Sequence, residues 1–345
     1  MPERSAAPLA PLTTLRLGGP ARRLVEATTE EELVTVVSDA DARGEPALVL
    51  GGGSNVVIAD DGFAGTVALV RTRGVEVDTD ACSGATVTLA AGEEWDPFVE
   101  RAVREGWVGV EALSGIPGLA GAVPIQNVGA YGQEVAQTVA SVRTYDRVDR
   151  RMRTFAASEC GFAYRASRFK SQPGRYVVLS VTFQFALGEL SAPIRYAELA
   201  RRLGVQPEDR AKARDVREAV LALRSGKGMV LDGRDHDTWS AVSFFTNPIL
   251  DAEGAARLPE EAPRFDQPDG RVKTSAAWLI DHAGFDKGYG SGGATLSTKH
   301  VLALTNRGDA TTDELLGLAR EVRDGVRAAY GIDLHNEPVL VGVEF

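Results

Sequence analysis

Residues 109–135 read GVEALSGIPGLAGAVPIQNVGAYGQEV, a stretch unlike a packed helix or strand. Its frequent glycines and two prolines forbid a long regular element, yet the apolar side chains between them, such as Leu113, Ile125 and Val128, favour burial. Glycines at every third position from 115 to 121 expose backbone N–H groups that suit the diphosphate of a nucleotide cofactor. A purely structural array of turns remains an alternative interpretation.

Two parts of this stretch, SGIPG (residues 114–118) and PIQNVGAYG (residues 124–132), resemble the flavin-binding core of the UDP-N-acetylenolpyruvoylglucosamine reductase family. These FAD enzymes complete UDP-N-acetylmuramic acid for cell-wall synthesis. The resemblance runs from Thr13 to the C-terminus. It implies an FAD site made by Ser114, Gly115, Ile116, Pro117, Gly118, Gln126, Asn127, Gly129, Ala130 and Tyr131.

Length and composition restrict the remaining classes. With 345 residues, of which 44% are hydrophobic, the chain can form two or three domains. A formal charge of −10 argues against a nucleic-acid or anionic-membrane surface, because both need a net basic face. The N-terminal residues have no apolar core of signal-peptide length, and no apolar run reaches membrane-spanning length. We therefore expect a cytoplasmic protein, and a monomer.

The two cysteines, Cys82 and Cys160, lie far apart and form no C-x-x-C motif. This spacing disfavours a disulfide framework, a zinc ribbon and a dithiol redox site, and we expect no metal site. Both cysteines are most simply small core residues.

A second glycine-rich turn lies between two short apolar segments. The segment ALVL (47–50) predicts a buried strand, GGGSN (51–55) a turn, and VVIA (56–59) a second strand. A Rossmann motif would instead open a helix, so that fold is disfavoured. The turn resembles the pyrophosphate loop of vanillyl-alcohol-oxidase-type FAD domains. That resemblance implies FAD contacts from Gly51, Gly52, Gly53, Ser54 and Asn55, and, because the turn has no histidine, non-covalently bound FAD.

Helix and strand signals alternate irregularly along the chain, which indicates an α+β fold. Thr29-x-x-Glu32 and Thr311-x-x-Glu314 are capping boxes that predict helix starts, Asp96 is a candidate N-cap, and residues 213–224 form an amphipathic pattern. Strands are predicted at 139–145, 153–155, 176–185 and 301–305. The resemblance implies a two-part FAD-binding domain (1–72 with 336–345, and 73–225) and a separate α+β substrate-binding domain at 226–335.

The segment YRASRFK (residues 164–170) is unusually basic for an acidic protein. By itself such a cluster is either a solvated face or an anion site. It matches the family's Tyr-Arg-x-Ser-x-Phe-Lys motif residue for residue. The resemblance implies that Arg165 lies at the active centre.

The segment VSFFTNP (residues 242–248) is the second strong match. Most relatives have Gly-Ser-Phe-Phe-Lys-Asn-Pro, so Val242 and Thr246 depart from the pattern. A serine beside two phenylalanines is often only a hydrogen-bonded strand residue. The resemblance makes Ser243 the candidate proton donor and not an acyl nucleophile, since the hydrolase G-x-S-x-G motif is absent.

Further site residues rest on the resemblance alone. It implies that Tyr196 closes over the substrate, although an aromatic that only anchors a surface loop is an alternative. It also implies substrate contacts for Lys227 and Asn247, weaker ones for Lys299 and His300, and a catalytic role for Glu337 in the near-terminal Glu-Pro pair.

The resemblance implies a two-step reaction in which NADPH reduces FAD and the reduced flavin delivers hydride to the enolpyruvyl group of UDP-N-acetylglucosamine enolpyruvate. Arg165 would stabilise the negative charge that develops, and Ser243 would supply a proton. With no separate Rossmann site, NADPH would alternate with the substrate. Two other functions stay open: a different FAD oxidase or dehydrogenase on this scaffold, and a catalytically silent nucleotide-sugar-binding protein.

Overall fold

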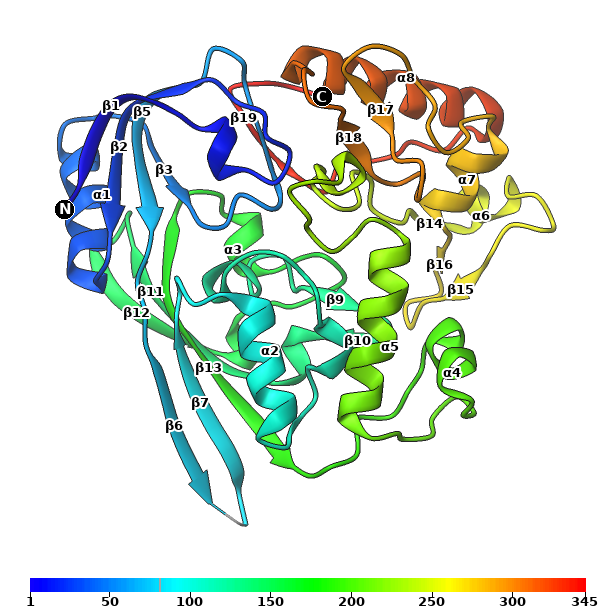
Figure 1. Ribbon diagram of the computed structural model, residues 1–345, viewed down its shortest axis with the longest axis horizontal. Helices are drawn as coiled ribbons and strands as arrows, with labels where there is room; N and C mark the ends of the chain where they lie inside the picture. The colour runs from blue at the N-terminus through cyan, green and yellow to red at the C-terminus, as the bar shows by residue number, and fades with distance from the viewer. Residues whose placement is uncertain (81) are drawn as a thin grey trace. The chain divides into compact units, whose positions relative to one another are not determined.

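The computed structural model describes residues 1–80 and 82–345, which form two compact units (Figure 1). The first unit contains residues 1–7, 21–52 and 64–225, and the second contains residues 8–20, 53–63 and 226–345. Both units mix helices and strands, so the predicted α+β class is confirmed. The finer division into three parts stays a prediction.

One sheet of the first unit has the strand order β1-β2-β5-β3. Its strands are β1 (Glu3–Pro8), β2 (Pro20–Ala27), β5 (Phe63–Val70) and β3 (Ala47–Leu50). Helix α1 (Glu30–Ala42) follows β2, and its start is the predicted one: Thr29 Oγ1 accepts a hydrogen bond from the Glu32 N–H. The Glu32 carboxylate accepts from the Thr28 N–H, which makes the cap one residue wider than a standard capping box.

The other sheet of the first unit is antiparallel, with the order β12-β11-β13-β7-β6. Its strands are β12 (Arg151–Ala156), β11 (Val139–Asp146), β13 (Tyr176–Leu187), β7 (Gly84–Ala90) and β6 (Val75–Asp80), and β8 (Trp107–Val108) also pairs with β13. Helix α2 (Trp95–Arg104) packs on it through an aromatic core that includes Trp95, Phe98 and Phe183. The N-cap of α2 is Glu94, so the predicted capping role of Asp96 is wrong.

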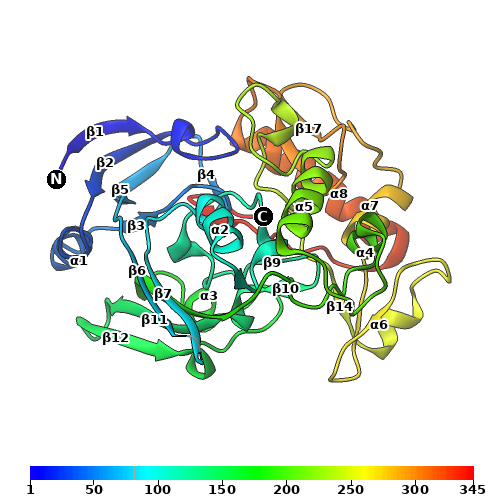
Figure 2. The same cartoon turned by 60° about the horizontal axis from the view of Figure 1, so that its bottom comes forward.

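The first unit is completed by a short hairpin and three helices. These are β9 (Gly129–Ala130), β10 (Gln133–Glu134), α3 (Arg168–Ser171), α4 (Ala197–Leu203) and α5 (Ala213–Gly226). Helix α5 confirms the amphipathic pattern at 213–224, because its buried side chains include Val216, Ala219 and Val220. Helices α2 and α5 lie side by side in both views (Figures 1 and 2).

The second unit is built around helix α8 (Thr312–Tyr330), whose complete capping box at Thr311 and Glu314 is the predicted one. Its strand pairs are β4 (Val56–Ile58) with β19 (Val339–Val341), and β17 (Ala294–Leu296) with β18 (Leu304–Asn306); β14 (Ile249–Leu250), β16 (Val272–Lys273) and β15 (Phe265–Asp266) form a third sheet. Helices α6 (Ala252–Ala256) and α7 (Ala276–His282) complete it. The strand predicted at 301–305 is displaced, because the Ala303 N–H closes a turn onto the His300 carbonyl before β18 begins.

The two cysteines differ in their surroundings. Cys160 is buried, as expected, whereas Cys82 is exposed, so the prediction that both are core residues is wrong for Cys82. Within residues 1–80 and 82–345, helices long and apolar enough to cross a membrane are absent.

Asp146, at the end of β11, predicts how the first unit responds to acid. Its buried carboxylate accepts hydrogen bonds from Arg175 Nε at 3.1 Å and Nη2 at 2.8 Å, and from the N–H groups of Val148 and Asp149. These bonds hold the pKa of Asp146 below its ordinary value, and the bond from Arg175 has the largest effect. The stabilisation is therefore present above the unfolded pKa of about 3.9 and is lost as pH falls through the folded pKa.

Asp146→Asn is expected to lower the Tm at pH 7 by several degrees, because the Arg175 guanidinium then lacks its buried charged partner. Thermal unfolding between pH 7 and pH 3 should show the variant losing less Tm on acidification than the wild type. Asp149→Asn, which removes a more exposed carboxylate 3.5 Å from the same arginine, is the control. Parallel pH curves for all three proteins would contradict the expectation.

Candidate functional site

The first turn of α2 fixes the glycine-rich loop of the first unit. Trp95 donates its ring Nε1–H to the Leu113 carbonyl at 3.2 Å and its backbone N–H to the Gly118 carbonyl at 3.1 Å. Between these points, the Gly115 N–H donates to Asp96 Oδ1 at 2.6 Å. These bonds fix the predicted cofactor loop, in which Leu113 is buried while Ile125 and Val128 are only half-buried.

Two glycine turns approach each other closely within the first unit. A Cβ added to Gly52 would lie 2.9 Å from the Gly118 Cα, so this approach of backbone to backbone requires glycine. Residues 51–52 and 116–118 remain half-exposed. Such a bare, fixed backbone edge fits the diphosphate of FAD, which needs N–H donors at close range.

The remaining residues of the predicted pyrophosphate turn belong to the second unit. Gly53 has a φ of +62° and its carbonyl accepts the Thr14 N–H at 3.0 Å. Asn55 Nδ2 donates to the Glu337 carbonyl at 3.5 Å, and the Asn55 carbonyl accepts the Val339 N–H. The structure therefore brings a predicted cofactor residue against a predicted catalytic residue.

The basic segment 164–170 folds onto residues 125–129 in the first unit. Arg165 Nη2 donates to the Gly129 carbonyl at 2.7 Å, and Ser167 Oγ donates to the Ile125 carbonyl at 2.7 Å. Lys170 Nζ donates to Gln126 Oε1 at 2.9 Å. These contacts favour an organised site over the solvated face that the sequence left open.

Asn127 uses its side chain inside the protein. The buried amide donates to Glu134 Oε2 and to the Ala163 carbonyl, both at 2.9 Å, and accepts the Ala136 N–H at 3.2 Å. The resemblance placed Asn127 in the FAD site, and in the structure these three groups fill the main bonding positions of its amide. Its role in the structure is to join the loop to the basic segment.

Several residues with a left-handed backbone lie in the predicted site segments. Asn127, Tyr131 and Arg165 have φ values of +41°, +49° and +52°, and Val242 has +64°. A β-branched side chain disfavours this region most. Val242, at a position where the family motif has glycine, therefore carries backbone strain. Strain of this kind, of order 1–3 kcal/mol, persists where the surroundings dictate the backbone and is frequent at functional sites.

Tyr131 and Tyr196 make an edge-to-face contact in the first unit, with ring centroids 5.4 Å apart. Burial raises the pKa of Tyr131 to about 12. Tyr196, the residue before α4, is 45% exposed. A predicted cofactor residue and the predicted substrate-closing residue are therefore neighbours.

Tyr196→Phe is expected to raise the apparent KM for the UDP-sugar by about one hydrogen bond, ~0.5–1.5 kcal/mol, because only the hydroxyl is lost. Flavin reduction by NADPH should be unaffected, since the ring contact with Tyr131 is retained. Steady-state kinetics of the variant beside Tyr289→Phe, which removes a hydroxyl bonded to Glu321, provide the measurement. An unchanged KM would leave Tyr196 with a packing role only.

The segments that carry Ser243 and Glu337 are paired in the second unit. Phe245 and Asn336 form an antiparallel bridge, flanked by bonds from the Glu337 N–H to the Phe244 carbonyl at 2.8 Å and from the Thr246 N–H to the His335 carbonyl at 3.0 Å. This is the closely spaced type of antiparallel pair. Ser243 therefore lies one residue beyond the position opposite Glu337, and both side chains are half-exposed.

Three other predicted substrate residues of the second unit have protein partners. Asn247 Oδ1 accepts the Ala276 N–H at 3.0 Å, at the start of α7. Lys299 pairs with Asp235, whose hydrogen bond raises the pKa of the lysine, and His300 Nδ1 accepts the Leu302 N–H at 3.0 Å. These contacts position local backbone, and substrate contacts by the three residues stay predictions.

Comparison with known proteins assigns the chain to a family. Its residues 21–153 match a profile described as FAD binding domain, and residues 234–341 match one described as UDP-N-acetylenolpyruvoylglucosamine reductase, C-terminal domain. A UDP-N-acetylenolpyruvoylglucosamine reductase of Cutibacterium acnes is 62% identical over 97% of this chain and 89% of its own length. The chain belongs to the UDP-N-acetylenolpyruvoylglucosamine reductase family.

Other members agree in sequence and in fold. The reductase of Streptomyces avermitilis is 60% identical over 98% of this chain and 94% of its own length. The crystal structure of UDP-N-acetylenolpyruvylglucosamine reductase from Thermus caldophilus superposes with a TM-score of 0.68 at 25% identity, covering 99% of this chain and 98% of that one. The predicted enzyme class, an NADPH-dependent FAD oxidoreductase, is confirmed by this membership.

Three ionisable residues that the sequence did not suggest as site residues contact the glycine-rich stretch or each other. Glu111 is fully buried inside the glycine-rich stretch, where its carboxylate accepts the N–H groups of Gly109 at 2.7 Å and Ala192 at 2.6 Å and the Gln133 amide at 2.8 Å. An ionisable residue within an apolar, glycine-rich run was the available signal. Asp96 and Arg217, whose Oδ1 and Nη1 atoms lie 2.6 Å apart, are the other two ionisable residues of this kind.

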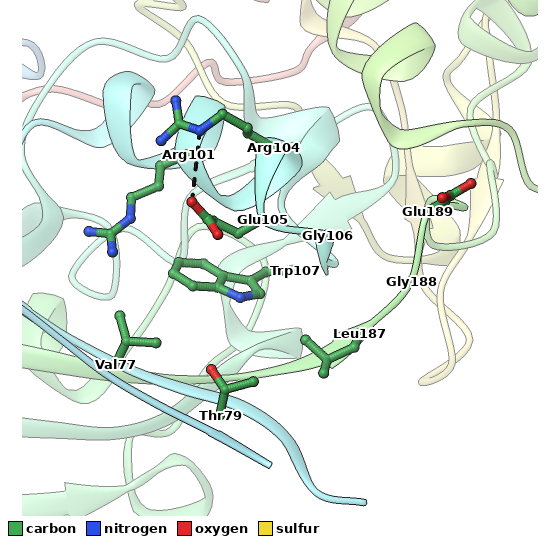
Figure 3. A pocket seen from close by; sticks show the side chains of 10 residues that line it. All are labelled: Val77, Thr79, Arg101, Arg104, Glu105, Gly106, Trp107, Leu187, Gly188 and Glu189. Atoms are coloured by element: carbon green, nitrogen blue, oxygen red, sulfur yellow. Dashed lines mark ion pairs between the residues drawn. The ribbon is translucent and has the colours of Figure 1, made fainter. Parts of the chain in front are cut away.

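A groove of about 540 Å³ lies elsewhere in the first unit, between α2 and the β6–β7 hairpin (Figure 3). Arg101, Arg104 and Trp107 approach it from the helix side, and Val77 and Thr79 from the hairpin. The described residues that line it include none of the predicted site residues, so the groove does not define the reductase site.

Proposed function

We propose that this chain reduces the enolpyruvyl group of UDP-N-acetylglucosamine enolpyruvate to give UDP-N-acetylmuramate, and that Arg165, Ser243 and Glu337 act directly on the substrate. Family membership supports the reaction. The single structural observation that best supports the residue roles is the pairing of residues 244–246 with 335–337, which holds the segment that follows Ser243 beside the segment that carries Glu337.

Each of the three residues has chemistry that the reaction needs. Bound FAD supplies the hydride transfer from NADPH to the enolpyruvyl carbon. Negative charge then develops beside the substrate carboxylate, and the guanidinium of Arg165, which donates to the Gly129 carbonyl at 2.7 Å, is preorganised to stabilise it. Ser243 Oγ donates the proton that completes the reduction. Glu337 positions the intermediate, or polarises it through water, and Lys227 steadies the serine alkoxide.

The cofactor is held by backbone and not by a covalent bond. Residues 51–55 and 114–118 supply close backbone approaches, and the turn 51–55 contains neither histidine nor cysteine that could bond to the flavin. Tyr196, Lys227 and Asn247 contact the UDP-sugar. NADPH uses the same site in alternation with the substrate, which gives ping-pong kinetics. A monomeric state and a cytoplasmic location complete the proposal.

A flavin colour test distinguishes this function from its alternatives. The purified protein should be yellow, bleach anaerobically with NADPH, and recolour when UDP-N-acetylglucosamine enolpyruvate is added. Bleaching by an alcohol or aldehyde, but not by NADPH, would favour another FAD oxidase or dehydrogenase. A colourless protein that binds the UDP-sugar would favour a silent binding protein. Acid precipitation should release all the colour, and colour kept in the pellet would contradict non-covalent binding.

A further inference from the structure

Asp96 connects three separate segments of the first unit. Its Oδ1 accepts the Gly115 N–H at 2.6 Å and Arg217 Nη1 at 2.6 Å, and its Oδ2 accepts Arg217 Nη2 at 3.1 Å. Asp96 lies in the first turn of α2, Gly115 in the glycine-rich loop and Arg217 on α5. The bridge therefore joins α2 to α5, its neighbour in Figures 1 and 2.

Gly115 is the point at which the loop changes direction. It is buried with a φ of +70°, and the half-exposed residues 116–118, which are proposed to face FAD, follow it directly. Only glycine adopts this conformation without strain, and here the N–H of the glycine is fixed by a carboxylate. The path of residues 116–118 therefore depends on Asp96.

A carboxylate at this place is unfavourable for an anionic ligand unless its charge is compensated. Arg217 provides that compensation through two parallel hydrogen bonds, with a side chain only 11% exposed. Burial alone would raise the pKa of Asp96, but the bonds from Arg217 and the Gly115 N–H outweigh burial and leave the pKa below its ordinary value. The pair is thus ionised and neutral in sum at pH 7. Glu100, 3.9 Å from Arg217, is the other carboxylate near this guanidinium.

We propose that Asp96 and Arg217 form a neutral clamp that positions Gly115 and thereby the diphosphate-binding edge of the loop for FAD. The inference rests on the proposed FAD contacts of residues 114–118. In the clamp, Asp96 holds the loop by a hydrogen bond, whereas Arg217 cancels the charge of Asp96 and holds its side chain in place. Neither residue needs to touch the flavin, so both are positioning residues.

The two roles predict different effects of four variants on the Kd for FAD. Arg217→Gln should raise the Kd ~10-fold at low salt, because an uncompensated charge near the diphosphate is worth roughly 1.4 kcal/mol. Asp96→Asn should not raise it and should lower it at low salt, because the amide oxygen still accepts the Gly115 N–H while Arg217 is left as an uncompensated positive charge near the diphosphate. The double variant Asp96→Asn/Arg217→Gln should have a Kd within ~3-fold of that of wild type, since the repelling charge is gone. Asp96→Ala should bind FAD ~10-fold more weakly than Asp96→Asn at any salt concentration, because both variants leave Arg217 without its carboxylate partner and only Asp96→Ala removes the anchor of the loop.

The measurement is a titration with FAD, followed by flavin fluorescence, of protein whose flavin has been removed, at 20 mM and 300 mM salt. Tm with and without FAD gives a second readout that requires no catalysis. Arg214→Ala is the matched control, because Arg214 forms an exposed pair with Glu218 on the same helix. Its Kd should equal that of wild type.

The outcomes separate the clamp from simple packing. Recovery of FAD affinity in the double variant, together with a salt-dependent defect in Arg217→Gln, supports the clamp even if Asp96→Ala folds poorly. Equal Kd values in all variants, or a defect in the double variant as large as in Arg217→Gln, would overturn it. Failure of the wild-type protein to bind FAD would instead contradict the proposed function.

Discussion

Ser243→Ala is expected to slow flavin reoxidation by the enolpyruvyl substrate by ~10²–10⁴ while NADPH reduces the flavin at a near-normal rate. The asymmetry follows from the proposed chemistry, because a carbon atom is protonated only in the second half-reaction. Ser243 is half-exposed and follows the strained Val242, so its hydroxyl is presented by a backbone that neighbouring bonds hold in place. Loss of one hydroxyl at such a position should affect stability by only about 1 kcal/mol.

Anaerobic stopped-flow absorbance of the flavin measures the two half-reactions separately. Thr246→Ala is the matched control, because Thr246 lies three residues further along the same segment and its hydroxyl donates to the His335 carbonyl at 3.4 Å. The control should keep both rates. Equal slowing of both steps in Ser243→Ala would indicate that the serine has a structural role. If neither step slows, Glu337 or water supplies the proton.

Arg165→Lys is expected to slow the second half-reaction by ~10²–10³, the usual effect of removing a preorganised group that stabilises developing charge. A lysine keeps the charge but lacks the planar fork that here donates to the Gly129 carbonyl at 2.7 Å and reaches the Asn127 carbonyl at 3.4 Å. The ammonium group would therefore be less fixed at the moment when charge builds up. FAD content should stay close to that of wild type.

Arg168→Lys tests whether any arginine of the basic segment would give the same result. Arg168, the first residue of α3, donates to the Glu159 carbonyl at 2.7 Å, so its replacement should leave both half-reactions unchanged. The flavin spectrum of each variant reports FAD content independently of activity. If the flavin of Arg165→Lys were reoxidised at the wild-type rate, the role of Arg165 would be limited to its hydrogen bonds with the glycine-rich loop.

The fold could be predicted from the sequence where the signal is local. Helix starts at Thr29 and Thr311 follow from side chains that bond to N–H groups three residues away, and α5 follows from an apolar stripe of helical period. The glycine-rich loops could also be recognised from the sequence, because glycine, the residue without a side chain, is identified directly from the residue type. The family motifs located Arg165, Ser243 and Glu337 as candidates in the same way.

The tertiary structure alone decided how polar groups are shared between distant segments. The residues around Asp96 predicted an N-cap. Folding instead brings the Gly115 N–H and the Arg217 guanidinium to its carboxylate, which bonds the strongest donors within reach. Asn127 likewise bonds through its amide to groups from residues 134, 136 and 163, and the isolated Phe245–Asn336 bridge joins two segments that show no strand pattern in the sequence. A hydrogen bond depends on which atoms come within about 3 Å, and chain order does not fix that distance for residues far apart in the sequence.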